Sequence, residues 1–334
     1  MATRIKALKR PKVAAGAHPI ETTRYLLSTP SITIFLTALC QWISNRATGG
    51  MVYGPPRFGK TRAIKYLTLM LAKKFGANLP ILTMSCLKYT TPREGVFFED
   101  LLRAAGHSLS KSGTAAAKRY RLNEFLVEKI ERSGQDRLIL FVDEAQRLHE
   151  QHYNWLIDVH NEMDSHGLVL IVILVGQQQL LHQFSAFQKT SKTQIIGRFM
   201  VHQLKFQGIT SEKDLRACLA SYDVKSEYPP DSGCSFTRYY FPAAFESDLR
   251  LESYAALSWQ AFREVREELL LPITREIPMQ YFCRTVEYIL TSFGTLEDLP
   301  TELSLAQWKD AIRKSGYADA ERYVVECEKY ERES

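Results

Sequence analysis

The segment at residues 54–61, GPPRFGKT, has the residue types and spacing of a phosphate-binding loop. It lies between the apolar residues MVY and the helical pattern RAIKYLTLMLAKKF. Gly54 and Gly59 allow backbone N–H groups to converge on phosphate oxygens, Lys60 offers a positive charge, and Thr61 offers a hydroxyl to Mg²⁺. A Gly/Pro turn with a surface lysine is the alternative, but the flanking pattern favours ATP and Mg²⁺. The expected nucleotide contacts are Gly54, Pro55, Pro56, Arg57, Phe58, Gly59, Lys60, Thr61 and Arg62.

Two adjacent carboxylates end the apolar strand pattern RLILFVDEAQRL at residues 137–148. Asp143 is suited to hold Mg²⁺ together with Thr61, and Glu144 to orient and polarise the attacking water. Taken alone, an apolar strand that ends in Asp-Glu is often only a helix cap. Because the phosphate-binding loop precedes it, the pair predicts an enzyme that hydrolyses ATP to ADP and phosphate.

Two further positions are candidates for contact with the γ-phosphate. Gln177 follows the apolar pattern GLVLIVILVG, and ligands of parallel sheets sit at the carboxyl ends of the strands. It is either a sensor of the γ-phosphate or an ordinary residue at a helix start. Arg198, in IIGRF, stands just before another short strand and faces outward in this interpretation. It is either an arginine supplied in trans to a neighbouring subunit's nucleotide or a solvated or structural arginine.

The order of strand and helix patterns predicts an α/β parallel sheet flanked by helices, with a small C-terminal helical lid. The periodicity turns helical after residue 206. The insert within the lid is rich in proline and aromatic residues, and either packs its own aromatics or docks a partner. The predicted regions are a basic flexible arm at 1–17, the nucleotide-binding domain at 18–208, the lid at 209–295 with the insert at 222–247, and a helical tail at 296–334.

Composition indicates a soluble protein without a membrane partner. The chain has 334 residues and a net charge of +6, and apolar runs such as 168–175 are shorter than the ~18 residues that a span needs. The six cysteines show no metal-ligand or CxxC spacing, which fits a reducing cytoplasm. The basic N-terminal arm is either mobile in solvent or bound to an anionic partner.

The motifs GPPRFGKT, LFVDEAQ, LVGQ and IIGRF, in this order, resemble the AAA+ ATPases of the TnsC/TniB type. These proteins regulate transposition in Tn-family and CRISPR-associated transposons of bacteria. Residues 18–43 are also similar to the segment before the phosphate-binding loop in that family. The resemblance implies an AAA+ fold and an ATPase that forms rings or helical filaments, with a hexamer or heptamer per turn, on double-stranded DNA. The implied partners are the transposase TnsB, the endonuclease TnsA and a target-selection protein of the TniQ type.

The resemblance also implies a role for specific basic residues. It favours Arg198 as the trans-acting arginine and suggests a second sensor arginine in the lid, for which Arg275 is the candidate and Arg284 the alternative. It implies that DNA is contacted after the second strand, although a flexible loop and a solvated helical turn would also carry such charges. No acid interrupts residues 103–121. The candidates for DNA binding are Lys88, Arg93, Lys111, Lys118, Arg119 and Arg121.

Two other functions remain open from the sequence. One is another DNA-directed AAA+ ATPase, such as a loader of replication proteins. The other is a P-loop signalling or secretion ATPase in which the basic segment has no DNA to bind. ATP-dependent and salt-dependent binding to random duplex DNA would separate the DNA-directed proteins from the third class.

Overall fold

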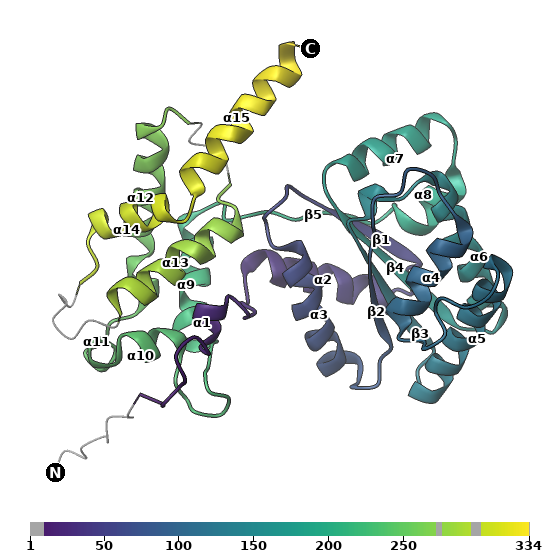
Figure 1. Ribbon diagram of the computed structural model, residues 1–334, viewed down its shortest axis with the longest axis horizontal. Coiled ribbons are helices and arrows are strands. Elements are labelled where there is room, and N and C mark those ends of the chain that lie inside the picture. Colours follow the sequence, from purple (N-terminus) through teal and green to yellow (C-terminus); the bar gives the residue numbers. More distant parts are fainter. Residues whose placement is uncertain (1–9, 272–275, 295–301, 334) are drawn as a thin grey trace. The chain divides into compact units, whose positions relative to one another are not determined.

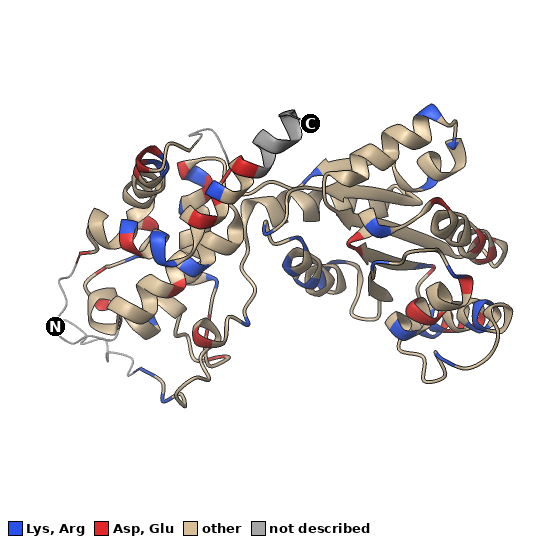
Figure 2. Cartoon of the chain, turned by 45° about the horizontal axis from the view of Figure 1, so that its top comes forward, with Lys and Arg blue, Asp and Glu red and all other residues tan. Residues whose placement is uncertain are grey.

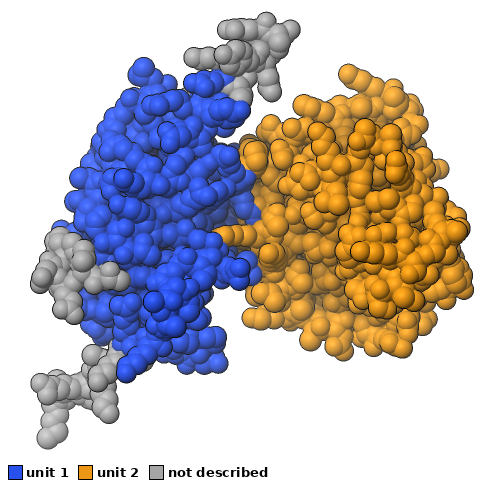
Figure 3. All heavy atoms as spheres, in the orientation of Figure 1, with its two compact units in different colours: residues 1–31, 57–59, 207–334 blue, residues 32–56, 60–206 orange. Residues whose placement is uncertain are grey.

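The computed structural model describes residues 10–271, 276–294 and 302–333 (Figure 1). The chain divides into two compact units, drawn in different colours in Figure 3. The α/β unit comprises residues 32–56 and 60–206. The helical unit comprises the described residues of 1–31, 57–59 and 207–334.

A five-stranded, fully parallel sheet forms the centre of the α/β unit, with strand order β2-β3-β4-β1-β5. Its strands are β1 (Gly49–Tyr53), β2 (Ile81–Ser85), β3 (Arg137–Asp143), β4 (Val169–Gly176) and β5 (Gln203–Lys205). The helical elements around it are α2 (Pro30–Ser44), α3 (Lys60–Phe75), α4 (Glu94–Ala105), α5 (Ala115–Ser133), η1 (Ala145–Arg147), α6 (Glu150–Ser165), α7 (Gln179–Lys189) and α8 (Thr193–Phe199). This parallel sheet flanked by helices confirms the predicted fold class.

The sheet register brings three chain segments to one edge. Tyr53 at the end of β1 pairs with Gly176 at the end of β4, and Asp143 at the end of β3 pairs with Val175. The central residues of β3 and β4 are apolar because helices cover both faces of a parallel sheet. The phosphate-binding loop, the carboxylate pair and the residue after β4 therefore leave the sheet at the same edge.

The helical unit contains only helices and connecting segments among its described residues, apart from one isolated bridge between Ile209 and Ile277. Its helices are α1 (Pro19–Thr22), α9 (Glu212–Val224), α10 (Phe236–Tyr240), α11 (Pro242–Glu246), η2 (Leu251–Tyr254), α12 (Ala255–Glu268), α13 (Met279–Phe293), α14 (Leu305–Lys314) and α15 (Tyr317–Glu333). The presence of these C-terminal helices agrees with the predicted lid. No described helix is long and apolar enough to cross a membrane.

The N-terminal boundary differs from the predicted one at residue 18. Residues 18–31 belong to the helical unit, where Ile20, Tyr25 and Leu27 are buried in its core. The Tyr25 hydroxyl lies 2.9 Å from the Tyr222 hydroxyl and donates to the Glu287 carboxylate at 2.8 Å. These partners are distant in sequence, so the local pattern of residues 18–31 did not indicate the unit to which they belong.

The insert and part of the predicted tail also contribute to the core of the helical unit. Tyr239 stacks on the buried His18 ring with centroids 4.3 Å apart, and Phe236 meets the same ring edge-on. Trp308 and Tyr317 are fully buried in this core. The insert therefore packs its aromatic residues internally, and the region from α14 to the start of α15 is an integral part of the unit rather than an extension from it.

Candidate nucleotide-binding site

The phosphate-binding loop leaves β1 tightly against neighbouring strands. The backbone N–H of Gly54 donates to the Gly176 carbonyl at 3.2 Å, and a Cβ at residue 54 would lie 2.3 Å from the Phe206 carbonyl oxygen. Only glycine fits there without a shift of the backbone. Gly59, with φ +94°, has the left-handed conformation that glycine tolerates best. Both glycines of the motif thus have a backbone reason for their positions.

Lys60 begins α3 and has only 7% of its surface exposed. Its ammonium group donates to the carbonyl oxygens of Gly54 and Pro55, each at 2.7 Å. Burial lowers the pKa of Lys60 to about 8, and the nearby Glu144 and Asp143 carboxylates oppose this effect. The lysine is therefore held inside the loop by neutral acceptors, which a phosphate can replace with a stronger, charged acceptor.

Thr61 and Asp143 lie together as predicted for a magnesium site. The Thr61 hydroxyl donates to Asp143 Oδ2 at 2.7 Å, and the other carboxylate oxygen accepts from the Glu144 N–H at 2.9 Å. One hydroxyl and one carboxylate are the protein ligands that Mg²⁺ takes when phosphates and water complete its shell. The donor set fits the ion, which Thr61 and Asp143 would hold.

Glu144 follows the strand with a left-handed backbone, φ 56°, which is rare for a residue with a side chain. Its Oε2 accepts from the side-chain amide of Gln146 at 2.8 Å. The oxygen of that same amide accepts from the backbone N–H of Gln177 at 3.1 Å. Gln146 therefore joins the predicted catalytic carboxylate to the start of the segment after β4.

Gln146 was not among the residues predicted from the sequence. A Cβ at Gly176 would lie 2.4 Å from Gln146 Oε1, so the glycine provides the space that the amide fills. The Gly-Gln pair at residues 176–177, opposite the DEAQ motif, is the sequence signal that could have identified it. Gln177 contacts the Gln146 amide through its backbone N–H. The sensor role of the Gln177 side chain stays a prediction.

Arg198 lies away from the nucleotide edge of its own sheet. Its carbonyl accepts from the Thr48 hydroxyl at 2.7 Å, just before β1 begins, whereas the phosphate-binding loop follows the other end of β1. Its guanidinium contacts Asn161 Oδ1 at 2.8 Å and His160 Nδ1 at 3.0 Å. Burial and the Arg198 charge lower the pKa of His160, which suits a neutral ring that accepts this hydrogen bond. Arg198 therefore cannot serve the nucleotide of its own subunit, and its action in trans stays a prediction.

The central residues of the phosphate-binding loop contact α13 within the helical unit. The Arg57 guanidinium donates to the Tyr281 hydroxyl, and the Arg57 carbonyl accepts from the Gln280 N–H at 3.1 Å. Arg284 lies near the same tyrosine, with its guanidinium carbon 6.0 Å from the ring centroid. The other lid candidate, Arg275, lies outside the described residues.

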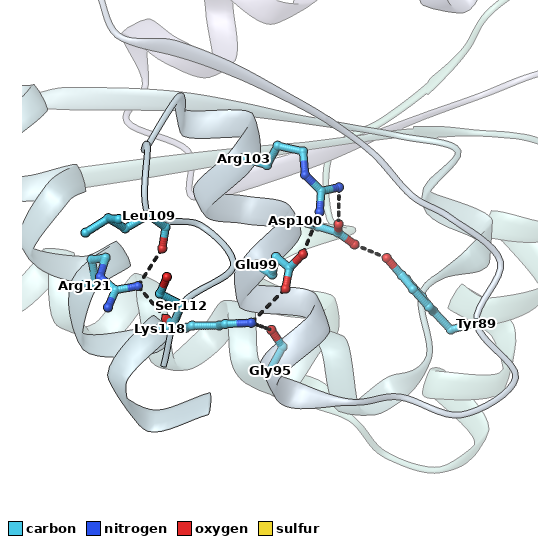
Figure 4. A network of polar contacts seen from close by, with 9 residues as sticks. All are labelled: Tyr89, Gly95, Glu99, Asp100, Arg103, Leu109, Ser112, Lys118 and Arg121. Carbon is cyan, nitrogen blue, oxygen red and sulfur yellow. Dashed lines mark hydrogen bonds and ion pairs between the residues drawn. The ribbon is translucent and has the colours of Figure 1, made fainter. Parts of the chain in front are cut away.

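Three of the predicted DNA-binding residues are engaged within the α/β unit, and Figure 4 shows two of them, Lys118 and Arg121. Lys118, only 7% exposed, forms an ion pair with Glu99 at 2.8 Å. Arg121 donates to the carbonyls of Leu109 and Ser112 at 2.7 and 2.8 Å, which closes the loop before α5. Arg119 lies 3.3 Å from a carboxylate oxygen of Glu94.

The acids that pair with Lys118 and Arg119 come from α4, outside the acid-free stretch at residues 103–121. Basic and acidic residues alternate over the helices of both units in Figure 2. Lys118 was expected to face DNA, but its charge is buried and paired with Glu99, so the side chain does not face solvent. Arg119 and Arg121 also have partners and are weaker candidates than the sequence suggests.

The other three candidates remain available to an anion. Lys88, Arg93 and Lys111 are exposed, and no hydrogen bond or ion pair ties their side chains to another described residue. Lys88 and Arg93 lie in the β2–α4 loop (residues 86–93), and Lys111 lies in the loop before α5. DNA contact by these three side chains stays a prediction.

Residues 43–184 match the family model described as an AAA domain. No curated protein sequence matches the chain.

Several solved structures are similar to the chain at low sequence identity. The ORC2 protein of Aeropyrum pernix in its ADP form has 14% identity and a TM-score of 0.48, and the match covers 86% of this chain and 68% of that chain. Domain III of the replication initiation protein DnaA from Thermotoga maritima has 15% identity and a TM-score of 0.43, with 86% and 94% covered. Drosophila ORC bound to AT-rich DNA and Cdc6 has 12% identity and a TM-score of 0.42, with 79% and 38% covered.

The family match spans Lys60, Thr61, Asp143, Glu144 and Gln177, and these residues meet at one edge of the parallel sheet. The residues of the candidate site therefore lie within the part of the chain that is similar to an AAA domain.

Proposed function

We propose that this chain is an AAA+ ATPase that assembles on double-stranded DNA and regulates transposition. The observation that carries the ATPase assignment is the contact of Thr61 with Asp143 beside the buried Lys60 ammonium. A lysine, a hydroxyl and a carboxylate in this arrangement match the requirements of a nucleoside triphosphate with its magnesium ion. The adjacent Glu144 supplies the remaining group that hydrolysis needs.

Each residue has a separate role in the proposed hydrolysis. Lys60 exchanges its bonds to the Gly54 and Pro55 carbonyls for bonds to the β- and γ-phosphates. Bound Mg²⁺ supplies positive charge to these phosphates. Glu144 accepts a hydrogen bond from the attacking water and polarises it. Arg198 of a neighbouring subunit contributes positive charge where the γ-phosphate leaves, an effect worth about 10³ to 10⁵ in rate in other enzymes.

Two substitutions test the hydrolysis proposal. Lys60→Ala should abolish ATP binding because the charge that recognises the phosphates is lost. Glu144→Gln should retain ATP binding and lower turnover by at least about 10², because only the group that polarises water is changed. Equilibrium binding and phosphate release measure the two effects separately. Hydrolysis by Glu144→Gln at the wild-type rate would show that the catalytic carboxylate is another residue.

The DNA assignment rests on the three exposed and unpaired side chains of Lys88, Arg93 and Lys111, and on the resemblance of the motifs to the TnsC/TniB type. About three phosphate contacts in one subunit give a salt slope of only about −3, which corresponds to weak binding. An assembly repeats these contacts along the duplex, and effective concentration raises avidity by roughly 10² to 10⁴. DNA binding should therefore require ATP, because ATP and Arg198 join neighbouring subunits.

The partners proposed on DNA are the transposase TnsB, the endonuclease TnsA and a target-selection protein of the TniQ type. Electron microscopy of the protein with ATP and random duplex DNA should show rings or helical filaments. Stimulation of strand transfer by the transposase would support the transposition role. Assembly on DNA without such stimulation would favour another DNA-directed ATPase, such as a loader of replication proteins. No salt-dependent DNA binding would favour a signalling or secretion ATPase.

A further inference from the structure

One arginine side chain spans the catalytic carboxylate and the first residue after β2. Arg147, in η1, donates from NH1 to the Cys86 carbonyl at 2.9 Å. Its NH2 lies 3.6 Å from Glu144 Oε2. The backbone N–H of Cys86 in turn donates to the Asp143 carbonyl at 2.9 Å. Cys86 is thereby attached both to the magnesium-binding residue and, through Arg147, to the water-polarising residue.

Cys86 is also the first residue of the β2–α4 loop, which carries two of the three available cations. Lys88 and Arg93 are exposed in this loop and have no described partner. Beyond Cys86, the loop is attached through Tyr89: its carbonyl lies 3.2 Å from His149 Nε2, and its hydroxyl donates to Asp100. A phosphate that pulls on Lys88 or Arg93 therefore acts on a segment whose first residue is bonded to Arg147.

The guanidinium can transmit such a movement because its nitrogens are held in one plane. If the loop shifts, Arg147 must either carry Glu144 with it or lose one of its two contacts. The Gln146 amide donates to the same carboxylate oxygen at 2.8 Å. If the contact from Arg147 to this oxygen changes, the position of the oxygen and its access to the attacking water change as well. The position of Glu144 is thus coupled to the conformation of the β2–α4 loop.

We propose that Arg147 is a positioning residue that couples the β2–α4 loop to Glu144, so that duplex DNA held by Lys88 and Arg93 changes the rate of ATP hydrolysis. The inference rests on the proposed function, because it assumes both hydrolysis and DNA binding. The Arg147 side chain is 41% exposed and its contact with Glu144 is a single ion pair. Such a link can change the rate by up to about fivefold.

The test compares the turnover number of ATP hydrolysis without DNA and with saturating random duplex DNA. The variants are Arg147→Ala and Arg147→Lys. Lysine keeps the charge but has one nitrogen, which cannot hold Cys86 and Glu144 at once. Arg132→Ala is the matched control, because Arg132 lies on α5 with a 78% exposed side chain and, among the described residues, pairs with Glu128 alone. DNA affinity by anisotropy and the KM for ATP are measured for every protein.

In the wild type and the Arg132→Ala control, DNA should change the turnover number by up to about fivefold. In both Arg147 variants this ratio should fall to about one, while DNA affinity and KM stay within about twofold of the wild type. A wild-type ratio retained in Arg147→Ala and Arg147→Lys would overturn the coupling. The coupling would also be overturned if the wild type bound DNA but hydrolysed ATP at the same rate with and without DNA. Absence of DNA binding by the wild type would overturn the proposed function, and the coupling with it.

Discussion

The buried state of Lys60 predicts that ATP affinity depends on pH. Without nucleotide the ammonium group is bonded only to backbone carbonyls, and its pKa is lowered to about 8. Phosphates favour the charged lysine, so ATP binding keeps Lys60 protonated. Above the pKa of the free protein, binding must therefore take up a proton, and the affinity falls as the pH rises.

The size of this effect follows from the shifted pKa. With a pKa of about 8, Lys60 is about 90% protonated at about pH 7 and about 3% protonated at about pH 9.5. The dissociation constant for ATP should then rise about 30-fold between these values, provided that bound phosphates hold the pKa of the complex above the range. Proton uptake per bound ATP should increase from about 0.1 to about one. A lysine with its ordinary pKa of about 10.4 would give a change of only about 10%.

Isothermal titration calorimetry in buffers of different ionisation enthalpy measures both the affinity and the proton uptake. Lys60→Arg is the control, because a guanidinium stays charged over this range. The Lys60→Arg variant should bind ATP more weakly than the wild type, but titration of residue 60 should not make its affinity depend on pH. A wild-type affinity that stays flat to about pH 9.5 would refute the assigned environment of Lys60. An equal fall in Lys60→Arg would assign the pH dependence to another group.

Other predictions concern the subunit interface, the DNA surface and the packing of the site. Arg198→Ala should lower turnover by at least about 10³, and mixing it with Lys60→Ala subunits should restore part of the activity; no rescue at any ratio would exclude a role in trans. Lys118→Ala should lower the free energy of unfolding by about 1 to 2 kcal/mol in urea titrations. It should leave the salt slope of DNA binding unchanged, and a flatter slope would show that Lys118 contacts DNA. Gly176→Ala should cost about 1 to 3 kcal/mol in stability and lower turnover, because its Cβ displaces the Gln146 amide; wild-type turnover would show that this amide is dispensable. DNA affinity should fall about equally on all duplex sequences, with a salt slope nearer zero, when alanine replaces three residues together: Lys88, Arg93 and Lys111.

The main residues of the candidate nucleotide site could be selected from the sequence because their signals are local. Gly54, Lys60 and Thr61 lie within eight consecutive residues, and Asp143 and Glu144 are adjacent at the end of a recognisable strand. In a parallel sheet, such segments meet at one edge whatever the details of packing. Both the fold class and the central part of the site therefore followed from short-range patterns.

The parts that could not be predicted depend on side chains from distant segments. Lys118 looks like part of a basic cluster in the sequence, and only the packing of α4 against α5 shows that Glu99 neutralises it. Gln146 is one polar residue among many until the amide is seen between Glu144 and the N–H of Gln177. A count of charges along the chain carries no information on such pairing.

The packing of residues 18–31 into the helical unit has a consequence for synthesis of the protein on the ribosome. The α/β unit is nearly continuous in sequence, so it can fold as soon as residue 206 has emerged. Ile20 and Tyr25 are made before the α/β unit, whereas their core partners Tyr222, Phe282 and Trp308 are made after it. At the usual rates of elongation this delay is on the order of tens of seconds. During that time the apolar residues of this segment are exposed and available to chaperones, and a ribosome that stops before α9 would release a chain in which the segment has no core to join.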